Sequence, residues 1–496
     1  MSKPAVALRL VALFAVAGLV ASCGGQNGSQ DPFEPCDLPG VGGRVMCGTV
    51  PVAEDRGDAD SRTIDLYVVV AKAHATHSAV KDPIFFFAGG PGDSAGTFAT
   101  HMIGPWEGLR HDRDLVFIDQ RGTGRSNALF CDFLGPPDKL QTYVVDMFPI
   151  DELPACREQG AHKAKLEKYT TTESIHDFDA VRRRLGYEKI NLVGYSYGTR
   201  VVLEYLRRYP QTIRAAVLRG PLPTYAHVPT GMARDTERAL DHLFQDCAED
   251  AACSANFPTL KADLLQFLSA IPEDGLRGPA ARPDGGIEEV VVPYGLFVSW
   301  IRSQLYSVER TARLPAAIKQ MAQGDLKEVL TAVVNWRRVM SEELADGMYL
   351  SVICAEDLPY FDLASELEAA RGTMIDDYRA RQQSDACQVW VQGDVPEDFH
   401  DPVTVDVPVL ILTGEVDPST PLRFARSLAR DLPNALSIEV PNRSHGLRWK
   451  WADCLGPLTD RFLRTGGRAP LDHGCVKGLT RPPFELPDSA PASTGQ

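Results

Sequence analysis

The stretch INLVGYSYGTRVVLEYL, residues 190–206, constrains the fold of this chain more than any other. A short apolar run ends at Val193 and a long helical pattern starts after Gly198, so only a sharp turn separates a buried strand from a helix. Small residues flank Ser196 and let two chain segments pass close together. We therefore expect Ser196 to stand at a tight strand-to-helix bend, at the carboxyl edge of a parallel sheet.

Strand-like and helical patterns alternate along much of the chain. Short, fully apolar runs fit strands that are buried on both faces, as in parallel sheets covered by helices. The helical patterns carry apolar residues three and four positions apart, as in residues 174–186, which Gly186 is placed to end. The sequence therefore predicts an α/β fold with a mostly parallel, doubly wound sheet. The strands are expected at residues 45–52, 63–73, 82–88, 113–120, 189–194, 214–220, 407–414 and 435–441, and further helices at 199–210 and 421–433.

The pattern changes between residues 224 and 392, where helical runs dominate. The chain of 496 residues is also too long for one compact unit of roughly 100–200 residues. We interpret residues 36–223 and 393–478 as two parts of one α/β core, with residues 224–392 inserted between them as a helical lid. The Pro-, Ser- and Ala-rich residues 479–496 are expected to form a disordered tail.

The charge balance limits the classes of partner. The formal net charge is −15, and an acidic surface argues against nucleic acid as a partner. The hydrophobic content of 44% is ordinary for a globular protein and allows a large buried core.

The first 22 residues are expected to be an export signal. Lys3 and Arg9 precede the apolar run LVALFAVAGLV, which is too short to cross a bilayer. The segment LVASC resembles a bacterial lipoprotein box, which implies cleavage before Cys23, a lipid on its thiol, and a flexible tether over residues 23–35. The expected location is the cell envelope, on the periplasmic or extracellular face, and the outer membrane where the cell has one. The alternative is an ordinary secretory signal followed by an incidental cysteine.

The cysteines agree with export. Eleven occur, and setting Cys23 aside leaves an even number, as expected for disulfides in an oxidising compartment. The alternative is that some of them are buried free thiols. No Cys-x-x-Cys motif occurs, so we expect neither a zinc site nor any other metal or cofactor. The pairs suggested by nearness along the chain are Cys36 with Cys47, Cys247 with Cys253 and Cys454 with Cys475, and Cys131 with Cys156 and Cys354 with Cys387 complete the set.

Two segments fit the pattern Gly-x-Ser-x-Gly, one around Ser94 and one around Ser196. The pattern arises by chance often enough that its context decides. Ser94 is separated from the apolar run ending at Phe87 by a glycine-rich stretch that contains Pro91, whereas Ser196 follows its strand directly. We therefore predict that Ser196 is a nucleophile and that the Ser94 hydroxyl forms local hydrogen bonds.

The glycine-rich stretch AGGPG, residues 88–92, has an expected role in the same site. When a serine attacks a carbonyl group, negative charge develops on the carbonyl oxygen, and two backbone N–H groups must bind it. One is expected from Tyr197, the residue after the nucleophile. The other is expected from Gly90, because glycine lets the backbone approach a ligand closely. The alternative is an ordinary structural turn.

The remaining candidate residues follow in the order serine, acid, histidine, which is usual where the serine stands on such a bend. Asp417 and His445 each come just after a predicted strand. Glu415 is the alternative acid and His473 the alternative base, whereas His400 precedes Asp417 and so has the wrong order. His445 would take the proton of the serine, and Asp417 would orient the imidazole.

Together, the motifs GGPG, DQRGTGRS, GYSYG, GEVDPSTP and SHG resemble those of the S33 serine peptidases, and within them the secreted tripeptidyl aminopeptidases with a TAP-like C-terminal segment. The resemblance covers nearly all of the mature chain outside the helical insertion. It implies an α/β-hydrolase fold with a helical lid and the release of short peptides, such as tripeptides, from free N-termini. A proline iminopeptidase or an esterase would use the same three residues. A non-catalytic surface lipoprotein is the alternative of another class.

The resemblance also suggests where the amino group of a substrate binds. An ammonium group needs buried or half-buried carboxylates, and Glu356 and Asp357, in the segment SVICAEDLPY, are the candidates. An ordinary charged pair at a helix end is the alternative. Arg219 stands where relatives often carry an acidic residue, so the specificity of this chain is expected to differ. Asp119 and Arg121 are expected to form a buried charge pair beside the site.

Overall fold

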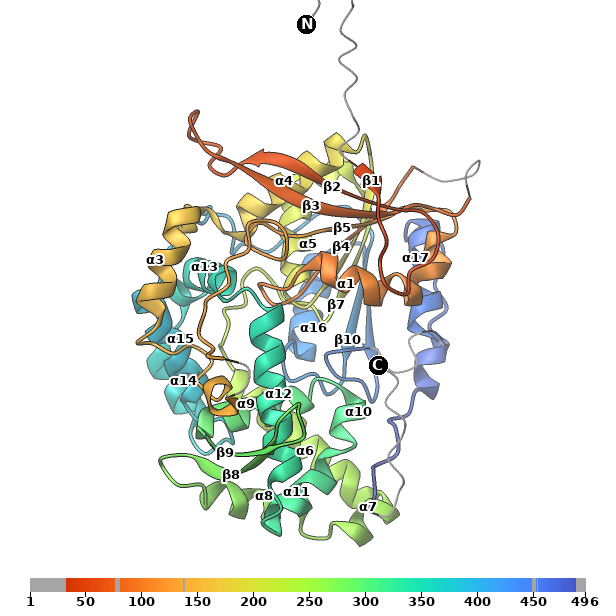
Figure 1. The fold of residues 1–496 in the computed structure, drawn as a ribbon. Helices are drawn as coiled ribbons and strands as arrows, with labels where there is room; N and C mark the ends of the chain where they lie inside the picture. Colours follow the sequence, from red (N-terminus) through yellow and green to blue (C-terminus); the bar gives the residue numbers. More distant parts are fainter. Residues whose placement is uncertain (1–32, 76–80, 137–138, 448–451, 453, 488–496) are drawn as a thin grey trace, which may run out of the picture. The chain divides into compact units, whose positions relative to one another are not determined.

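A nine-stranded sheet, in the order β1-β2-β3-β5-β4-β6-β7-β10-β11, carries the fold (Figure 1). The pairs β1–β2, β2–β3 and β3–β5 are antiparallel, and every pair from β5 through β4, β6, β7 and β10 to β11 is parallel. The prediction of a mostly parallel sheet is confirmed. The strands are β1 Phe33–Pro35, β2 Val45–Ala53, β3 Thr63–Ala71, β4 Ile84–Phe87, β5 Leu115–Ile118, β6 Ile190–Tyr195, β7 Ile213–Arg219, β10 Val409–Gly414 and β11 Ala435–Val440.

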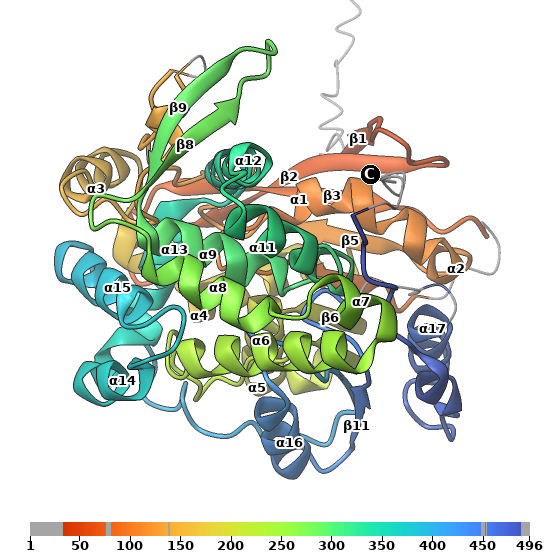
Figure 2. The same cartoon turned by 90° about the horizontal axis from the view of Figure 1, so that it is seen from below.

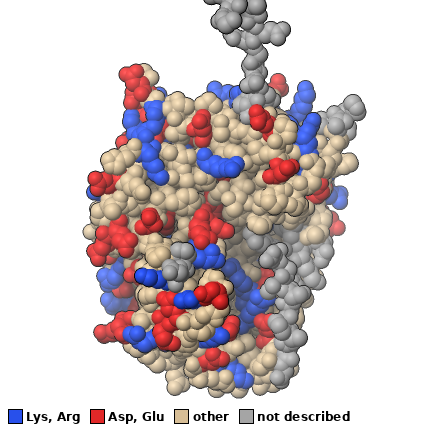
Figure 3. Space-filling model, viewed as in Figure 1, with Lys and Arg blue, Asp and Glu red and all other residues tan. Residues whose placement is uncertain are grey.

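The computed structural model describes residues 33–75, 81–136, 139–447, 452 and 454–487. The predicted export signal, Cys23 and most of the predicted tether therefore lie outside the described residues. Among the helices of the described residues, none combines the length and the hydrophobicity that a membrane crossing requires. On the face shown in Figure 3, Lys and Arg side chains are interspersed with Asp and Glu.

Helices cover both faces of the sheet, because its central strands are apolar on both sides. Along β4, Phe85 and Phe87 lie in one hydrophobic core, and Ile84 and Phe86 lie in another. The first core includes apolar residues of α4, α5 and α16, and the second includes residues of α1, α2 and α17. The doubly wound arrangement is therefore confirmed. These helices are α1 Ala95–Met102, α2 Glu107–Arg110, α4 Thr171–Arg184, α5 Tyr197–Arg208, α16 Leu422–Asp431 and α17 Leu455–Thr465. The helix α3 Leu153–Lys163 also contributes apolar residues to the first core.

The predicted insertion contains helices and one hairpin. The elements between residues 232 and 343 gather below the sheet in the view of Figure 1, whereas the helices of residues 346–389 lie beside it, and several of the former overlie the sheet in Figure 2. The elements between residues 232 and 343 pack in a separate hydrophobic core, whereas the helices at residues 346–356 and 378–389 contribute apolar residues to the first core of the sheet. The antiparallel hairpin β8–β9 was not predicted, although residues 283–286, Pro-Asp-Gly-Gly, are a recognisable turn signal between its strands. The elements are α6 Met232–Glu249, α7 Ala251–Asn256, α8 Leu260–Ser269, β8 Leu276–Ala281, β9 Ile287–Val292, α9 Tyr294–Gln304, α10 Val308–Thr311, α11 Leu314–Ala322, α12 Lys327–Glu343, α13 Asp346–Glu356, α14 Leu363–Ala370 and α15 Tyr378–Val389.

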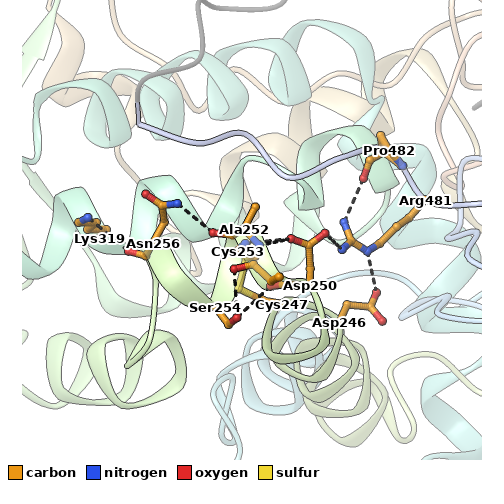
Figure 4. The surroundings of a disulfide bond; sticks show 11 residues. Asp246, Cys247, Asp250, Ala252, Cys253, Ser254, Asn256, Lys319, Arg481 and Pro482 are labelled. Atoms are coloured by element: carbon orange, nitrogen blue, oxygen red, sulfur yellow. Dashed lines mark hydrogen bonds and ion pairs between the residues drawn. A yellow bond between two sulfur atoms is a disulfide. The ribbon is translucent and has the colours of Figure 1, made fainter.

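Both predicted irregular ends contain ordered residues. Phe33–Pro35, at the end of the predicted tether, form the edge strand β1. In the predicted tail, Arg481 forms an ion pair with Asp250 at 3.0 Å, and Phe484 is buried in the core of the insertion (Figure 4). The prediction of a disordered tail was wrong for residues 479–487, because an aromatic residue and a cation there find partners on α6 and α7. Residues 488–496 lie outside the described residues.

All five predicted disulfides are present, so the alternative of buried free thiols is excluded for these ten cysteines. The Cys247–Cys253 bond joins α6 to α7 across a separation of 6 residues (Figure 4). The Cys354–Cys387 bond joins α13 to α15 across a separation of 33 residues. The two bonds therefore restrict the unfolded chain to different extents.

We expect the double variant Cys354→Ser/Cys387→Ser to lose more stability than Cys247→Ser/Cys253→Ser. Closing the longer loop removes more conformational entropy from the unfolded chain, which predicts losses of about 4 and about 2 kcal/mol respectively. Denaturant unfolding of both variants and the parent protein measures the free energies of unfolding. Equal losses, or a larger loss for the shorter loop, would contradict the entropic explanation.

Candidate active site

Ser196 stands at the bend between β6 and α5, as predicted. Its φ of 55° lies in the left-handed region, so the backbone turns sharply there. A Cβ atom at Gly194 would lie 2.4 Å from the carbonyl oxygen of Gly198, and one at Gly198 would lie 2.2 Å from the carbonyl oxygen of Phe87. Neither position can therefore carry a side chain, which explains why a glycine is needed on each side of the serine.

The structure brings Ser196, His445 and Asp417 together in one hydrogen-bonded chain. Ser196 Oγ lies 2.9 Å from His445 Nε2, and His445 Nδ1 lies 2.8 Å from Asp417 Oδ2. The three residues follow β6, β11 and β10 respectively, at the carboxyl edge of the parallel strands. This arrangement can activate a serine hydroxyl, because the imidazole is placed to accept its proton and the carboxylate faces the other ring nitrogen.

Asp417 is fully buried and held by its own loop. The N–H groups of Ser419 and Thr420 donate to Oδ1 at 2.7 and 2.8 Å, and the Thr420 hydroxyl donates to Oδ2 at 2.7 Å. Burial alone would raise the pKa of this carboxyl group. The adjacent His445 and the N–H donors outweigh that effect and hold its pKa below the usual value. Asp417 is therefore ionised at neutral pH.

Gly220 also positions the imidazole, and the sequence analysis missed it. It follows β7 with a φ of 60°, and a Cβ atom there would lie 2.9 Å from Thr420 Oγ1 and 3.3 Å from His445 Nδ1. A side chain at this position would displace the ring or the hydroxyl beside it. The available signal was a glycine directly after a buried strand, where a close approach is common.

The glycine loop after β4 lies beside the nucleophile. A Cβ atom at Gly89 would lie 3.3 Å from Ser196 Cβ, and Gly90, with a φ of 100°, lines the same cavity as Ser196. Tyr197 is the first residue of α5, where backbone N–H groups have no partner within the helix. Gly90 thus shares the cavity with Ser196, and Tyr197 follows the serine directly.

Ser94 has the structural role that its context predicted. Its hydroxyl donates to Asp119 Oδ1 at 2.8 Å and accepts from the N–H of Thr97, so it caps α1. The expected pair between Asp119 and Arg121 was wrong. Asp119 accepts hydrogen bonds from the loop around Ser94 and from Arg125 N–H, whereas Arg121 binds Asp177 of α4 at 2.7 and 2.8 Å.

Ser196 and His445 open onto a cavity of about 450 Å³, a size typical of sites for small ligands. The cavity lies between the core and the insertion, so the insertion covers the reacting groups as a lid. Asp93 and Ser94 of the glycine loop also line it. The wall contributed by the lid includes Ser299, Arg302, Ser303 and Tyr306 from α9 and the turn after it, Trp336, Val339, Met340 and Glu343 from α12, and Tyr349 and Ile353 from α13.

The structure does not place Glu356 and Asp357 in the wall of this cavity. Both are buried, and Asp357 accepts two hydrogen bonds from Arg200 at 3.0 and 3.1 Å. Glu356 accepts from the N–H and the hydroxyl of Thr171 and lies 3.6 Å from Arg200. Burial raises the pKa of both carboxyl groups, against the opposing effect of Arg200. Their partners come from α4 and α5, so they join the lid to the core.

Asp93 is a candidate that the sequence analysis missed. A Cβ atom at Gly89 would lie 3.2 Å from Asp93 Oδ2, so this carboxylate lies close to Ser196 in the cavity. Burial and, to a smaller extent, the charge of Glu343 of the lid raise its pKa to about 7, against the opposing effect of His445. An acidic residue inside a glycine-rich loop was a visible signal, but the loop was interpreted through its backbone alone.

The alternative residues lie elsewhere. Glu415 accepts from the N–H of Asn442, and His473 is exposed and contacts the carbonyl oxygen of Leu471. His400 contacts the carbonyl oxygen of Thr224. None of the three belongs to the hydrogen-bonded chain at Ser196.

Arg219 is buried on β7, and its guanidinium lies 5.8 Å from the ring centre of Tyr195. The Tyr195 ring in turn packs on His445 at 5.2 Å. The Tyr195 ring therefore connects the Arg219 guanidinium with the His445 imidazole.

Two family models match the chain. The model described as alpha/beta hydrolase fold matches residues 82–277, which contain the glycine loop and Ser196. The model described as TAP-like protein matches residues 372–475, which contain Asp417 and His445. The two matches together cover all three members of the hydrogen-bonded chain.

Several known proteins are similar over most of this chain. It is 24% identical to Serine protease Hip1 of Mycobacterium tuberculosis, over 95% of this chain and 96% of the relative. It is 25% identical to Tripeptidyl aminopeptidase of Streptomyces coelicolor, over 88% of this chain and 84% of the relative. Among solved structures, Proline iminopeptidase of Mycobacterium smegmatis matches with 17% identity and a TM-score of 0.41, over 85% of this chain and 99% of that one.

The architecture and the family models agree. The parallel strands are covered by helices on both faces, the serine stands at the bend after β6, and the acid and histidine follow β10 and β11. The chain therefore has the α/β-hydrolase fold, and its residues 372–475 match the model of a TAP-like protein.

Proposed function

We propose that this protein is a serine peptidase that releases short peptides from the free N-termini of its substrates. The observation that carries the proposal is the hydrogen-bonded chain from Ser196 through His445 to Asp417, which opens onto the cavity under the lid. The names of two similar proteins, a serine protease and a tripeptidyl aminopeptidase, support the peptidase class.

The geometry accounts for a two-step reaction. In acylation, Ser196 Oγ attacks the carbonyl carbon of the scissile bond while His445 Nε2 accepts the hydroxyl proton. The C–N bond then breaks, and His445 gives that proton to the departing amine. In deacylation, His445 takes a proton from water and the water oxygen attacks the ester carbon. The bond between that carbon and Ser196 Oγ then breaks, which releases the acid product, and the proton returns to Ser196 Oγ. Asp417 holds the imidazole in place and stabilises its charged form.

Gly90 and Tyr197 are the proposed donors to the oxyanion. Attack on the carbonyl carbon places negative charge on its oxygen, and preorganised N–H groups stabilise that charge. Gly90 lines the same cavity as Ser196, and Tyr197, directly after the serine, is the first residue of α5. The positive end of the helix dipole adds to the stabilisation there.

We propose Asp93 and Glu343 as the carboxylates that bind the substrate's amino group. Both line the cavity with Ser196, whereas the earlier candidates Glu356 and Asp357 are occupied by Arg200 and α4. The loop of Asp93 and the lid segment after Glu343 are in direct contact, since Ala345 N–H donates to the Gly92 carbonyl oxygen at 3.1 Å. A cation bound there would relieve the repulsion between the two carboxylates.

The position of Asp93 favours a second candidate activity. In it the released product is a single amino acid, as in a proline iminopeptidase. Asp93 Oδ2 and Ser196 Cβ lie 3.2 and 3.3 Å from one point, the Cβ position of Gly89. An amino group held by Asp93 therefore belongs to the residue that carries the scissile carbonyl group. Each further residue would move the N-terminus roughly 3.3–3.6 Å away, so a tripeptide product requires an anchor farther along the cavity.

We also propose that the protein is exported and anchored to the envelope by a lipid on Cys23. Five disulfides support an oxidising compartment. The variant Cys23→Ser should lose incorporation of labelled palmitate and pass from the membrane fraction to the soluble fraction. Cys247→Ser/Cys253→Ser serves as a control for changes in cysteine content alone. Unchanged membrane association of the Cys23 variant, without label, would refute the anchor.

Replacing Ser196 by Ala should lower the turnover of alanine peptides about 10⁵–10⁶-fold, because the covalent route is lost. Ser94→Ala should retain most of its turnover, because its hydroxyl only caps α1 and binds Asp119. Mass spectrometry of a peptide pool measures both the rate and the product length. Loss of turnover in the Ser94 variant with retention in the Ser196 variant would reverse the assignment. Cleavage of N-acetylated peptides and esters at equal rates would favour an esterase.

The preference for a free amino group should depend on pH through Asp93. Its pKa of about 7 means that it is mostly protonated below that pH and ionised above it. The ratio of kcat/KM for a free-amine substrate to that for its N-acetyl form should therefore rise about fivefold between about pH 6 and pH 7. In Asp93→Asn, the ratio should be low and flat with pH. A ratio that keeps its pH dependence in this variant would exclude Asp93 as the anchor.

A further inference from the structure

We propose that Arg302 forms a subsite for a carboxylate on the leaving-group side of the cavity, so that this enzyme prefers short peptides whose C-terminal carboxylate is free. The inference rests on the proposed peptidase function and adds to it a second point of recognition. The proposed substrate is recognised at both ends, with its amino group near Asp93 and its carboxylate near Arg302.

Arg302 is a charged side chain of the cavity wall with unused hydrogen-bonding capacity. Its Nε and Nη2 atoms are buried, and among the described residues neither has a hydrogen-bond partner. A guanidinium group stays protonated in proteins, so it cannot avoid this cost by losing its charge. A buried donor without an acceptor costs about 1–3 kcal/mol, more for a charged group. A bound carboxylate would supply acceptors in the planar geometry that a guanidinium group matches.

The place of Arg302 connects it with the departing amine. The guanidinium carbon lies 4.9 Å from the ring centre of Tyr306, and that ring packs on the His445 ring with centres 5.0 Å apart. His445 must protonate the departing amine, so the leaving group extends past this imidazole. Peptides advance roughly 3.3–3.6 Å per residue, and the carboxylate of a leaving group one or two residues long can therefore reach the guanidinium.

Two other charged groups of the cavity wall, Arg379 and Asp235, already have partners. Arg379 donates to the Tyr349 hydroxyl at 2.6 Å and stacks over Phe148 at 5.1 Å. Asp235 lines the cavity but forms an ion pair with Arg423, in which Arg423 Nη2 donates to Asp235 Oδ2 at 2.7 Å. Arg302 differs from Arg379 because two of its buried nitrogen atoms have no acceptor among the described residues.

The position of Arg302 on α9 suits this role. Ser299, Arg302, Ser303 and Tyr306 lie three and four residues apart and face the cavity together. The hydroxyl groups of Ser299 and Ser303 donate to carbonyl oxygens within α9, at 2.7 Å each, so they do not compete for the guanidinium. The subsite is therefore a single cation on a rigid helix face.

The test compares three forms of an alanine dipeptide, tripeptide and tetrapeptide in the intact protein: the free acid, the C-terminal amide, and the amide with Asp as the final residue. For the parent protein we expect kcat/KM for the free acid to exceed that for the amide about tenfold or more, as for a hydrogen bond to a charged group. In Arg302→Met the ratio should fall to about one, and hydrolysis of an aminoacyl p-nitroanilide, which has no such carboxylate, should fall much less than hydrolysis of the free acid. Arg302→Lys should recover part of the preference, because it keeps the charge but loses the planar pair of donors.

The outer-face variant Arg338→Met, from an exposed ion pair with Glu342 on α12, controls for loss of a lid cation. If the amide ending in Asp is preferred as strongly as the free acid, the subsite takes any carboxylate and the restriction to chain ends is wrong. If free acids and amides are cleaved equally by the parent protein, or if Arg302→Met slows the p-nitroanilide as much as the free acid, the subsite is refuted.

Binding to Ser196→Ala, measured by calorimetry with the same peptides, separates this inference from the proposed function. Tighter binding of the free acid, abolished by the added Arg302→Met change, supports the subsite even if the parent protein cleaves none of these peptides. In that case the peptidase proposal fails and the carboxylate subsite stands. Equal affinity for acid and amide overturns the subsite, whatever the rate of cleavage.

Discussion

The close crossing of two chain segments at the bend after β6 is the constraint on which the site depends. A Cβ atom at Gly198 would lie 2.2 Å from the Phe87 carbonyl oxygen, so the end of β4 and the start of α5 touch backbone to backbone. This contact fixes the glycine loop that follows β4 beside the serine that follows β6. Gly90, Asp93 and Ser196 share one cavity because no side chain separates these segments.

A buried ion network then fixes the lid to that bend. Arg200, four residues after Ser196 on α5, binds Asp357 at the end of α13 and faces Glu356 beside it. Leaving a buried charge without its partner costs about 3–5 kcal/mol, so these groups hold one another in place. The network therefore holds the lid in a fixed position relative to the core, on the two sides of the cavity. This also explains why two adjacent carboxylates, which could bind an ammonium group of a substrate, instead bind partners within the protein.

The cavity itself retains charges of both signs whose partners are incomplete. Asp93 has its pKa raised to about 7 by burial and by Glu343, and Arg302 has two buried nitrogen atoms without acceptors among the described residues. A molecule with an amino group at one end and a carboxylate at the other would satisfy both. Short peptides have that chemistry, and the serine lies between the two charges along the proposed path of the substrate.

The sequence by itself determined the sheet, the bend and the three reacting residues. Apolar runs and the glycines around Ser196 report local backbone geometry, and Asp417 and His445 each follow such a run directly. Only the tertiary structure decided which other charged residues face the cavity. Glu356 and Asp357 are buried by partners from α4 and α5, the bond from Arg200 to Asp357 spanning 157 positions, whereas Arg302 receives no such partner. The ionisation and availability of a charged side chain depend on neighbours brought together by packing, and no local pattern encodes them.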